Sequence, residues 1–191
     1  AKAFDEAAAR LTEHRGKAAV ALDQAMSAEL APLKMERAVF KTEISAADPG
    51  PEGRDAVTFT VATNPGAPSG PLNKIASGGE LSRFLLALKV CLTRDATGLT
   101  MIFDEIDRGV GGATADAVGR RLAELAQEGG QVLVVTHSPQ VAALGGHHWQ
   151  VAKSVEDGIT LSRVTALDAA ARIDEIARMP GGFVTLDNAK A

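Results

Sequence analysis

The chain has 191 residues, of which 46% are hydrophobic, and its 24 acidic side chains outnumber its 20 basic ones. This length and apolar content are sufficient for one domain with a buried core. The formal net charge of −4 provides no general attraction for nucleic acid, so any DNA contact would have to be local. No apolar run reaches the ~18 residues of a membrane span, and the first ten residues do not resemble a secretory signal. The single cysteine, Cys91, cannot form an internal disulfide, and we expect a soluble, cytoplasmic protein.

The N-terminal stretch predicts one long helix. Residues 2–30 are rich in Ala, Glu and Arg, which favour helix, and an apolar residue recurs every seventh position at Phe4, Leu11, Ala18 and Ala25. Because most of this stripe is alanine and Gly16 interrupts it, a coiled-coil arm and a plain amphipathic helix both remain open. The chain starts within this helical pattern and without a methionine, so we interpret it as part of a longer polypeptide.

After the helix the hydrophobic period changes from helical to alternating. Apolar and polar residues alternate over residues 38–45 and again over 57–61, on either side of the turn-rich segment DPGPEGRD. This pattern predicts a β-hairpin. Residues 64–71 are too rich in Pro and Gly for regular structure and predict a loop.

The remainder alternates between predicted helices and strands. Helices are expected at residues 79–95, 114–127 and 169–179, an apolar strand LTMIF at 99–103, a second strand QVLVVT at 131–136, and a closing hairpin at 147–153 and 159–164. Apolar strands separated by helices indicate an α/β fold with a parallel sheet covered on both faces.

The first chemical motif is Ser77-Gly78-Gly79-Glu80 at the start of an amphipathic helix. Two glycines allow close backbone approach, and the free N–H groups of a helix start favour an anion such as phosphate. The same four residues also fit an ordinary capping box, in which the serine and the glutamate satisfy the first backbone N–H groups.

The second motif is the acidic pair Asp104-Glu105, which follows directly after the apolar strand LTMIF. Ligands of open α/β folds bind at the C-terminal edge of the sheet, where this pair is expected to lie. In nucleotide hydrolases one carboxylate holds Mg²⁺ and a second orients or deprotonates the attacking water. The alternative is that both acids only mark the solvent end of the strand.

The third motif is Thr136-His137-Ser138, at the end of the next apolar strand. Parallel pairing would bring His137 to the same edge as Asp104 and Glu105, within reach of a terminal phosphate or its attacking water. A single histidine at a strand end is more often structural. His14, His147 and His148 have no neighbouring Cys or acidic spacing typical of a metal site, so we interpret them as non-ligands.

The three motifs follow one another at intervals of about thirty residues, roughly one strand–helix–strand step. This order matches ABC-type ATPases. Over most of residues 35–179 the sequence resembles the C-terminal head segment of RecN, a family of bacterial SMC-like repair ATPases, through KIASGGELSRFLLALKV, MIFDEIDRGVGGATADAVGRRL, QVLVVTHSPQVAALGGHHWQVAK and RIDEIARM.

The resemblance implies a fold and a set of residue roles. Residues 34–191 would form the C-terminal lobe of an ABC/SMC-type P-loop ATPase head, with a mostly parallel sheet preceded by a β-hairpin, and residues 1–33 the stub of a coiled-coil arm. The nucleotide-binding residues would be Ser77, Gly78, Gly79 and Glu80, which form the ABC signature, and Asp107, the D-loop acid. Walker B would supply Asp104 for Mg²⁺ and Glu105 for catalysis, and His137 would be the switch histidine, also catalytic.

The chain nowhere contains G-x-x-x-x-G-K-[ST], the Walker A loop that holds the β- and γ-phosphates. The resemblance implies two partners for this chain. One is the N-terminal half of the same head, which would carry the Walker A loop, and the other is a second identical head. The complete protein is expected to bind ATP and Mg²⁺, to act on DNA in double-strand break repair and recombination at the bacterial nucleoid, and to need no membrane. This chain alone is expected to be inactive.

Two other classes of function compete with this interpretation. A dimerisation or scaffolding module without catalysis would need no acidic pair, so retention of Asp104, Glu105 and His137 at these spacings argues against it. A transporter ATPase is disfavoured by the long helix that precedes the hairpin.

Overall fold

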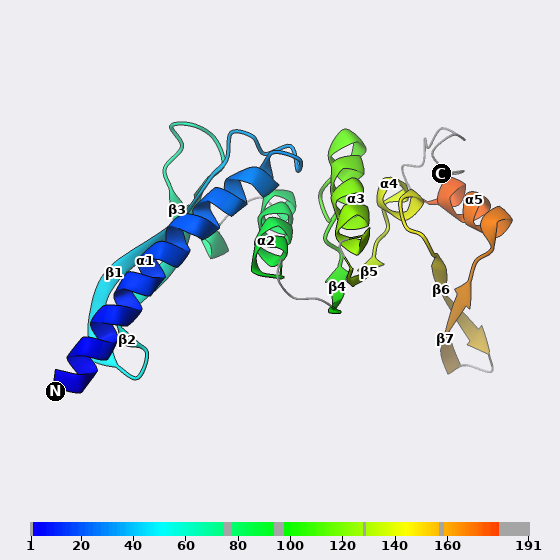
Figure 1. The fold of residues 1–191 in the computed structure, drawn as a ribbon. Coiled ribbons are helices and arrows are strands. Elements are labelled where there is room, and N and C mark those ends of the chain that lie inside the picture. Colours follow the sequence, from blue (N-terminus) through cyan, green and yellow to red (C-terminus); the bar gives the residue numbers. More distant parts are fainter. Residues whose placement is uncertain (1, 75–77, 94–97, 128, 157–158, 180–191) are drawn as a thin grey trace. The chain divides into compact units, whose positions relative to one another are not determined.

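The computed structural model describes residues 2–74, 78–93, 98–127, 129–156 and 159–179. Backbone contacts divide the chain into two units, residues 1–96 and 97–191, whose elements are labelled in Figure 1. The first unit therefore joins the N-terminal helix, the hairpin and the helix after it. The division predicted between residues 33 and 34 is of another kind, between a coiled-coil arm and a head. That division, and the coiled-coil character of the arm, stay predictions.

The predicted N-terminal helix is confirmed as α1, Lys2–Leu30. Its buried apolar positions are Ala8, Ala19, Met26 and Leu30, which recur at helical spacing along one side. The seven-residue stripe lies on the adjacent side, where Phe4 and Leu11 are more than a third exposed. Helix α1 thus packs within unit 1 through a different stripe from the one that suggested a coiled coil.

The predicted hairpin is also confirmed. Strands β1, Val39–Gly50, and β2, Gly53–Ala62, pair antiparallel, and a two-residue strand β3, Gly70–Pro71, adds to β2. Gly53 has φ +94°, and a Cβ there would lie 3.1 Å from a methyl carbon of Leu11 on α1. A glycine at the start of β2 is therefore required both by its backbone conformation and by the close approach of the helix.

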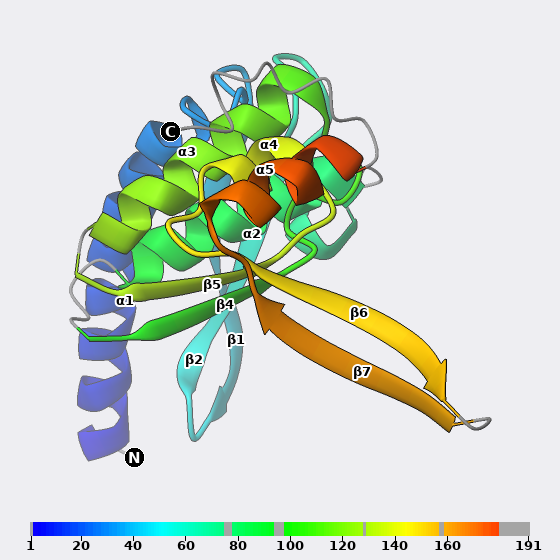
Figure 2. The same ribbon diagram turned by 90° about the vertical axis from the view of Figure 1, so that its right-hand side faces the viewer.

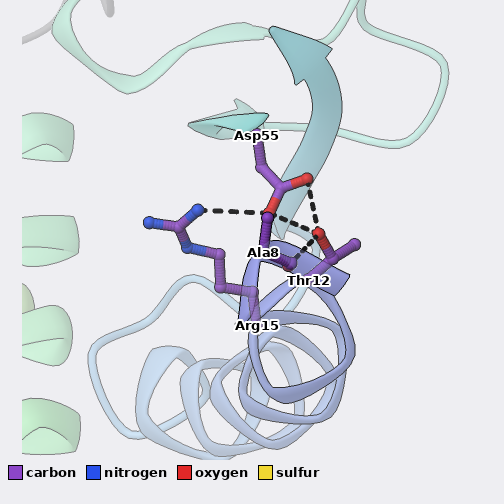
Figure 3. Close-up of polar contacts among 4 residues, drawn as sticks. All are labelled: Ala8, Thr12, Arg15 and Asp55. Atoms are coloured by element: carbon purple, nitrogen blue, oxygen red, sulfur yellow. Dashed lines mark hydrogen bonds and ion pairs between the residues drawn. The ribbon is translucent and has the colours of Figure 1, made fainter. Parts of the chain in front are cut away.

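A buried carboxylate ties β2 to α1 (Figure 3). The side chain of Asp55 is 6% exposed, and its two oxygens lie 2.9 and 2.8 Å from the hydroxyl of Thr12. Arg15, one helical turn further on, donates to the same carboxylate at 3.1 Å. Because hydrogen bonds to an ionised group in a shielded site are stronger than neutral ones, this contact fixes the rotation of α1 against the hairpin.

The last helix of unit 1 is α2, Gly78–Thr93, close to the predicted 79–95. It packs against α1 and buries Phe84, Leu86, Ala87 and Val90. A short 3₁₀ turn, Leu72–Lys74, precedes it.

Unit 2 begins with two parallel strands, β4, Thr100–Asp104, and β5, Gln131–Val135, joined by helix α3, Gly112–Gln127. Helix α3 packs against β5 (Figure 2). Phe103 is buried, whereas its neighbour Ile102, whose side chain alternates to the other face, is 59% exposed. The expected parallel pairing is confirmed, but the expectation that both faces are covered is not met at Ile102, because the described part of this chain leaves that face open.

The rest of unit 2 is a short helix, a hairpin and a final helix. Helix α4, Pro139–Ala143, was not predicted; the hairpin of β6, Trp149–Glu156, and β7, Ile159–Ala166, and helix α5, Ala169–Arg178, lie where the sequence placed them. Asp168 caps α5 by accepting a hydrogen bond of 2.9 Å from the N–H of Ala171. None of the described helices is long and apolar enough to cross a membrane.

The contact at Asp55 yields a stability prediction. Asp55→Ala should lower the free energy of unfolding of unit 1 by about 2 kcal/mol, because Thr12 and Arg15 both lose a charged acceptor in a shielded site. Urea titration followed by circular dichroism measures the change. The matched control is Glu13→Ala, which removes the exposed partner of Lys17 on the same helix and should cost less than about 0.5 kcal/mol. Equal losses in the two variants would contradict the anchoring role.

Candidate active site

The C-terminal edge of the β4–β5 pair collects three exposed chemical groups. Asp104 is the last residue of β4 and pairs in register with Val135, the last residue of β5. Glu105 follows β4 and His137 lies two residues beyond β5. The parallel pairing thus brings the predicted metal ligand and both predicted catalytic residues to one edge, with all three side chains exposed to solvent.

Glu105 has a left-handed backbone conformation, with φ +49°. Residues other than glycine adopt it rarely, because Cβ then crowds the backbone. Two hydrogen bonds hold it there: the N–H of Glu105 donates to the carbonyl of Val135 at 3.0 Å, and the N–H of Arg108 donates to the carbonyl of Glu105 at 3.0 Å. Glycine would therefore be less strained than glutamate at this position.

The only side-chain partner that the described structure gives the Glu105 carboxylate is Arg108, at 3.5 Å. Both side chains are more than half exposed, so this ion pair is weak and screened. The carboxylate therefore remains free to interact with a ligand or a water molecule at the sheet edge.

Asp107, in contrast, is fully buried, with 0% exposure. The hydroxyl of Thr136, the first residue after β5, donates to one of its carboxylate oxygens. The same hydroxyl accepts a hydrogen bond of 2.9 Å from the N–H of Ser138. The resemblance implied that Asp107 is the D-loop acid and binds nucleotide, whereas the structure places it beneath the surface, linked through Thr136 to the residues on either side of His137.

The short helix after His137 is held from two sides. Gly119 of α3 contacts α4 so closely that a Cβ on it would lie 3.2 Å from the Cα of Val141 and 2.8 Å from a methyl of Leu144. Arg172 of α5 donates to the carbonyl of Ala143 at 2.7 Å. The segment that carries His137 therefore runs between a strand end and an anchored helix, although neither contact was apparent from the sequence.

The predicted signature residues belong to unit 1. Ser77 lies outside the described residues, and Gly78, Gly79 and Glu80 form the first turn of α2. A Cβ on Gly78 would meet nothing within 4 Å, so the space beside it is open, whereas Gly79 is buried. Open space at Gly78, at the start of a helix, suits the approach of an anionic ligand.

Arg83, one turn after Gly79, fixes the start of α2, and the sequence interpretation missed it. It donates to the carbonyl of Gly79 at 3.1 Å and to those of Leu33 and Lys34 at 3.0 and 3.3 Å, in the turn that follows α1. Burial lowers the pKa of Arg83, and the nearby charge of Glu80 partly opposes that shift. An arginine inside an otherwise apolar helix face was the available signal.

The donor set at the sheet edge suits a hard cation only if the nucleotide completes the site. Among the residues that the structure describes, no group of three or more His, Cys, Asp or Glu side chains could hold a metal ion by itself. A single exposed carboxylate, Asp104, matches the way Mg²⁺ binds in nucleotide hydrolases, with few protein ligands and the rest from phosphate and water. The residues present therefore fit a nucleotide-bound Mg²⁺.

Curated relatives align with nearly the whole length of this chain. It is 46% identical over 193 aligned positions to the DNA repair protein RecN of Vibrio cholerae, an alignment that covers 98% of this chain and 35% of that protein. RecN of Rickettsia conorii is 43% identical over 95% of the chain. The chain belongs to the RecN family. It spans about a third of the length of these relatives, and no family model matches it.

Solved structures support the fold of this RecN segment. The Smc head domain with a coiled coil and joint from Pyrococcus yayanosii aligns with a TM-score of 0.64 over 82% of this chain and 28% of its own, at 22% identity. A chain from a study of ATP-driven dimerization and DNA-stimulated activation of SMC ATPases aligns with a TM-score of 0.61 over 84% of this chain and 91% of its own. The fold is thus that of an SMC-type head, in agreement with the fold class expected from the sequence.

The conformation of Glu105 leads to a prediction. At a left-handed position glycine is unstrained, so Glu105→Gly should be more stable than Glu105→Ala by about 1 kcal/mol. In the regular strand β4 the order should reverse, and Thr100→Gly should be less stable than Thr100→Ala. Thermal unfolding of the four variants measures both differences. Finding alanine equal to or better than glycine at position 105 would refute the left-handed conformation.

Proposed function

We propose that this RecN segment supplies the hydrolytic half of an ATP-binding head that acts in DNA repair. The observation that carries the proposal is Glu105, kept in a strained conformation with an exposed carboxylate beside Asp104 and on the same sheet edge as His137. The relatives of this chain are named as DNA repair proteins, which supports a role in DNA repair. A structural neighbour comes from work on ATP-driven dimerization of SMC ATPases, which supports ATP hydrolysis as the reaction.

The chemistry of each exposed group suggests its role. Glu105 would orient the water that attacks the terminal phosphate and take its proton, because a carboxylate free of a strong partner is an adequate general base. His137 would donate a hydrogen bond to the same phosphate or to that water. Asp104 would hold the magnesium ion, which when bound neutralises negative charge on the phosphates.

The missing phosphate cradle explains why two more pieces are needed. The chain contains no G-x-x-x-x-G-K-[ST] sequence, so the amides and the lysine that hold the β- and γ-phosphates must come from another segment. Ser77, Gly78, Gly79 and Glu80 would contact a nucleotide held by a second head, since the start of a helix is an anion site. Pairing of two heads around ATP would then be linked to DNA binding by the whole protein.

A scaffolding module without catalysis is the alternative, and the conformation of Glu105 disfavours it. A left-handed residue with no catalytic duty would gain stability on replacement by glycine, so a decayed site has no physical reason to keep glutamate there.

We predict first that the isolated chain binds ATP weakly and shows negligible steady-state hydrolysis, because it lacks the amides and lysine of a Walker A loop. A coupled phosphate-release assay on the purified chain tests this, with the chain joined to an N-terminal segment bearing the loop as the positive control. Turnover by the isolated chain at the rate of the joined head would contradict the prediction.

We predict second that the two acids fail differently in the joined head. Glu105→Gln retains size and hydrogen bonding but loses basicity, so ATP should still bind while turnover falls ~10²-fold, and paired heads should accumulate. Asp104→Asn weakens the magnesium ligand and should lower both nucleotide retention and turnover. Equilibrium binding of a fluorescent ATP analogue, phosphate release and analytical ultracentrifugation separate these outcomes. Parental hydrolysis by Glu105→Gln, or loss of its ATP binding, would remove the catalytic assignment.

A further inference from the structure

Asp107 lies next to the predicted catalytic residues yet has no access to a ligand. It is two residues beyond Glu105 and fully buried, and one carboxylate oxygen accepts from the hydroxyl of Thr136, while the other has no hydrogen-bond partner in the described structure. A nucleotide or a metal ion in the exposed edge site could not reach this carboxylate without rearrangement of the loop.

The hydrogen bonds lead from Asp107 to both sides of His137. Thr136 precedes the histidine and donates its single hydroxyl proton to Asp107, so the lone pairs of that hydroxyl are free to accept. The N–H of Ser138, which follows the histidine, donates to it at 2.9 Å. One hydroxyl thus links a buried carboxylate to the backbone on both sides of the exposed imidazole.

A second tie keeps the two loops in register. The N–H of Glu105 donates to the carbonyl of Val135 at 3.0 Å, which continues the β4–β5 ladder one step beyond its last pair. The backbones that carry Glu105 and His137 are therefore joined once through Val135 and once through Asp107 and Thr136. A small displacement of a catalytic group greatly lowers the reaction rate. Two links that fix the distance between the Glu105 and His137 loops would therefore affect catalysis.

We propose that Asp107 and Thr136 are positioning residues that hold the His137 loop against the Glu105 loop, and that Asp107 does not bind nucleotide or metal. The predicted effect on kcat rests on the proposed ATPase function. The hydrogen bonds that link Asp107, Thr136 and Ser138 do not depend on that function and can be measured in the isolated polypeptide. The two can therefore be tested separately.

The first test needs no nucleotide. Thr136→Val keeps the shape of the side chain and removes the hydroxyl, so in this chain the amide of Ser138 should exchange with solvent about tenfold faster by NMR, as expected for a lost hydrogen bond. The amide of Glu105, bonded to Val135, should keep its protection. Thr136→Ser restores the hydroxyl and should restore slow exchange at Ser138. Unchanged exchange in Thr136→Val would overturn the proposal.

The second test uses the head joined to a Walker A segment. Thr136→Val should lower kcat about tenfold with KM for ATP unchanged, and Thr136→Ser should recover most of it, since positioning affects the reacting geometry rather than ground-state binding. Thr100→Val is the matched control, because it removes a threonine hydroxyl that contacts Gln131 at the opposite end of the same strand pair. It should leave kcat within about twofold.

A double-mutant cycle then asks whether Thr136 acts through the histidine. In a His137→Ala background, Thr136→Val should have little further effect on kcat, because the group that it positions is gone. An equal loss in both backgrounds would overturn the proposal. If the parental head does not hydrolyse ATP at all, the proposed function fails, and amide exchange at Ser138 still decides the positioning role.

Should Thr136→Val not fold, Asp107→Asn still tests the part of the proposal that excludes Asp107 from binding nucleotide or metal. Its amide oxygen can still accept from Thr136, so a positioning role predicts ATP affinity and kcat within about threefold of the parental head. A direct charge contact with nucleotide or metal predicts a large loss of affinity instead. Such a loss would overturn the proposal and restore Asp107 to the binding site.

Discussion

Parallel pairing of β4 with β5 is the constraint on which the candidate site depends. Side chains alternate along each strand, and register therefore decides which groups share the edge. With Asp104 opposite Val135, the acidic pair and the histidine leave the sheet at the same level. A slip of one residue would exchange the buried Phe103 face for the exposed Ile102 face. The register of β4 and β5 thus determines both which apolar face is buried and where Asp104, Glu105 and His137 lie.

The charges around this edge fall into two physical classes. Asp104 and Glu105 remain in contact with solvent, where an ionised carboxylate costs little and is available to a ligand. Asp107 lies in the interior, where a carboxylate is tolerated only with hydrogen-bond donors, and Thr136 provides one. Three acids within four residues of sequence therefore lie in two different environments, Asp104 and Glu105 at the surface and Asp107 in the interior.

Unit 1 shows how polar contacts fix an element that apolar packing alone would leave free to rotate. Toward the N-terminal end of helix α1 the buried apolar residues are alanines, Ala8 and Ala19, whose packing is not strongly directional. The contact of Asp55 with Thr12 and Arg15 specifies its rotation, and Arg83 ties the turn that follows α1 to the first turn of α2. Hydrogen bonds of Arg83 thus connect the start of the predicted signature helix, α2, to the turn at the end of α1, the helix that was predicted to form the arm.

The sequence by itself determined the order and type of the elements, because hydrophobic periodicity is a local property. It also located the acidic pair and the histidine, since polar residues directly after apolar strands mark a sheet edge. Three features were decided only by tertiary structure. These are the burial of Asp107, the left-handed conformation of Glu105 and the anchoring of the His137 loop through Thr136, Gly119 and Arg172. Each depends on which groups meet across a distance in sequence, and no local pattern encodes that.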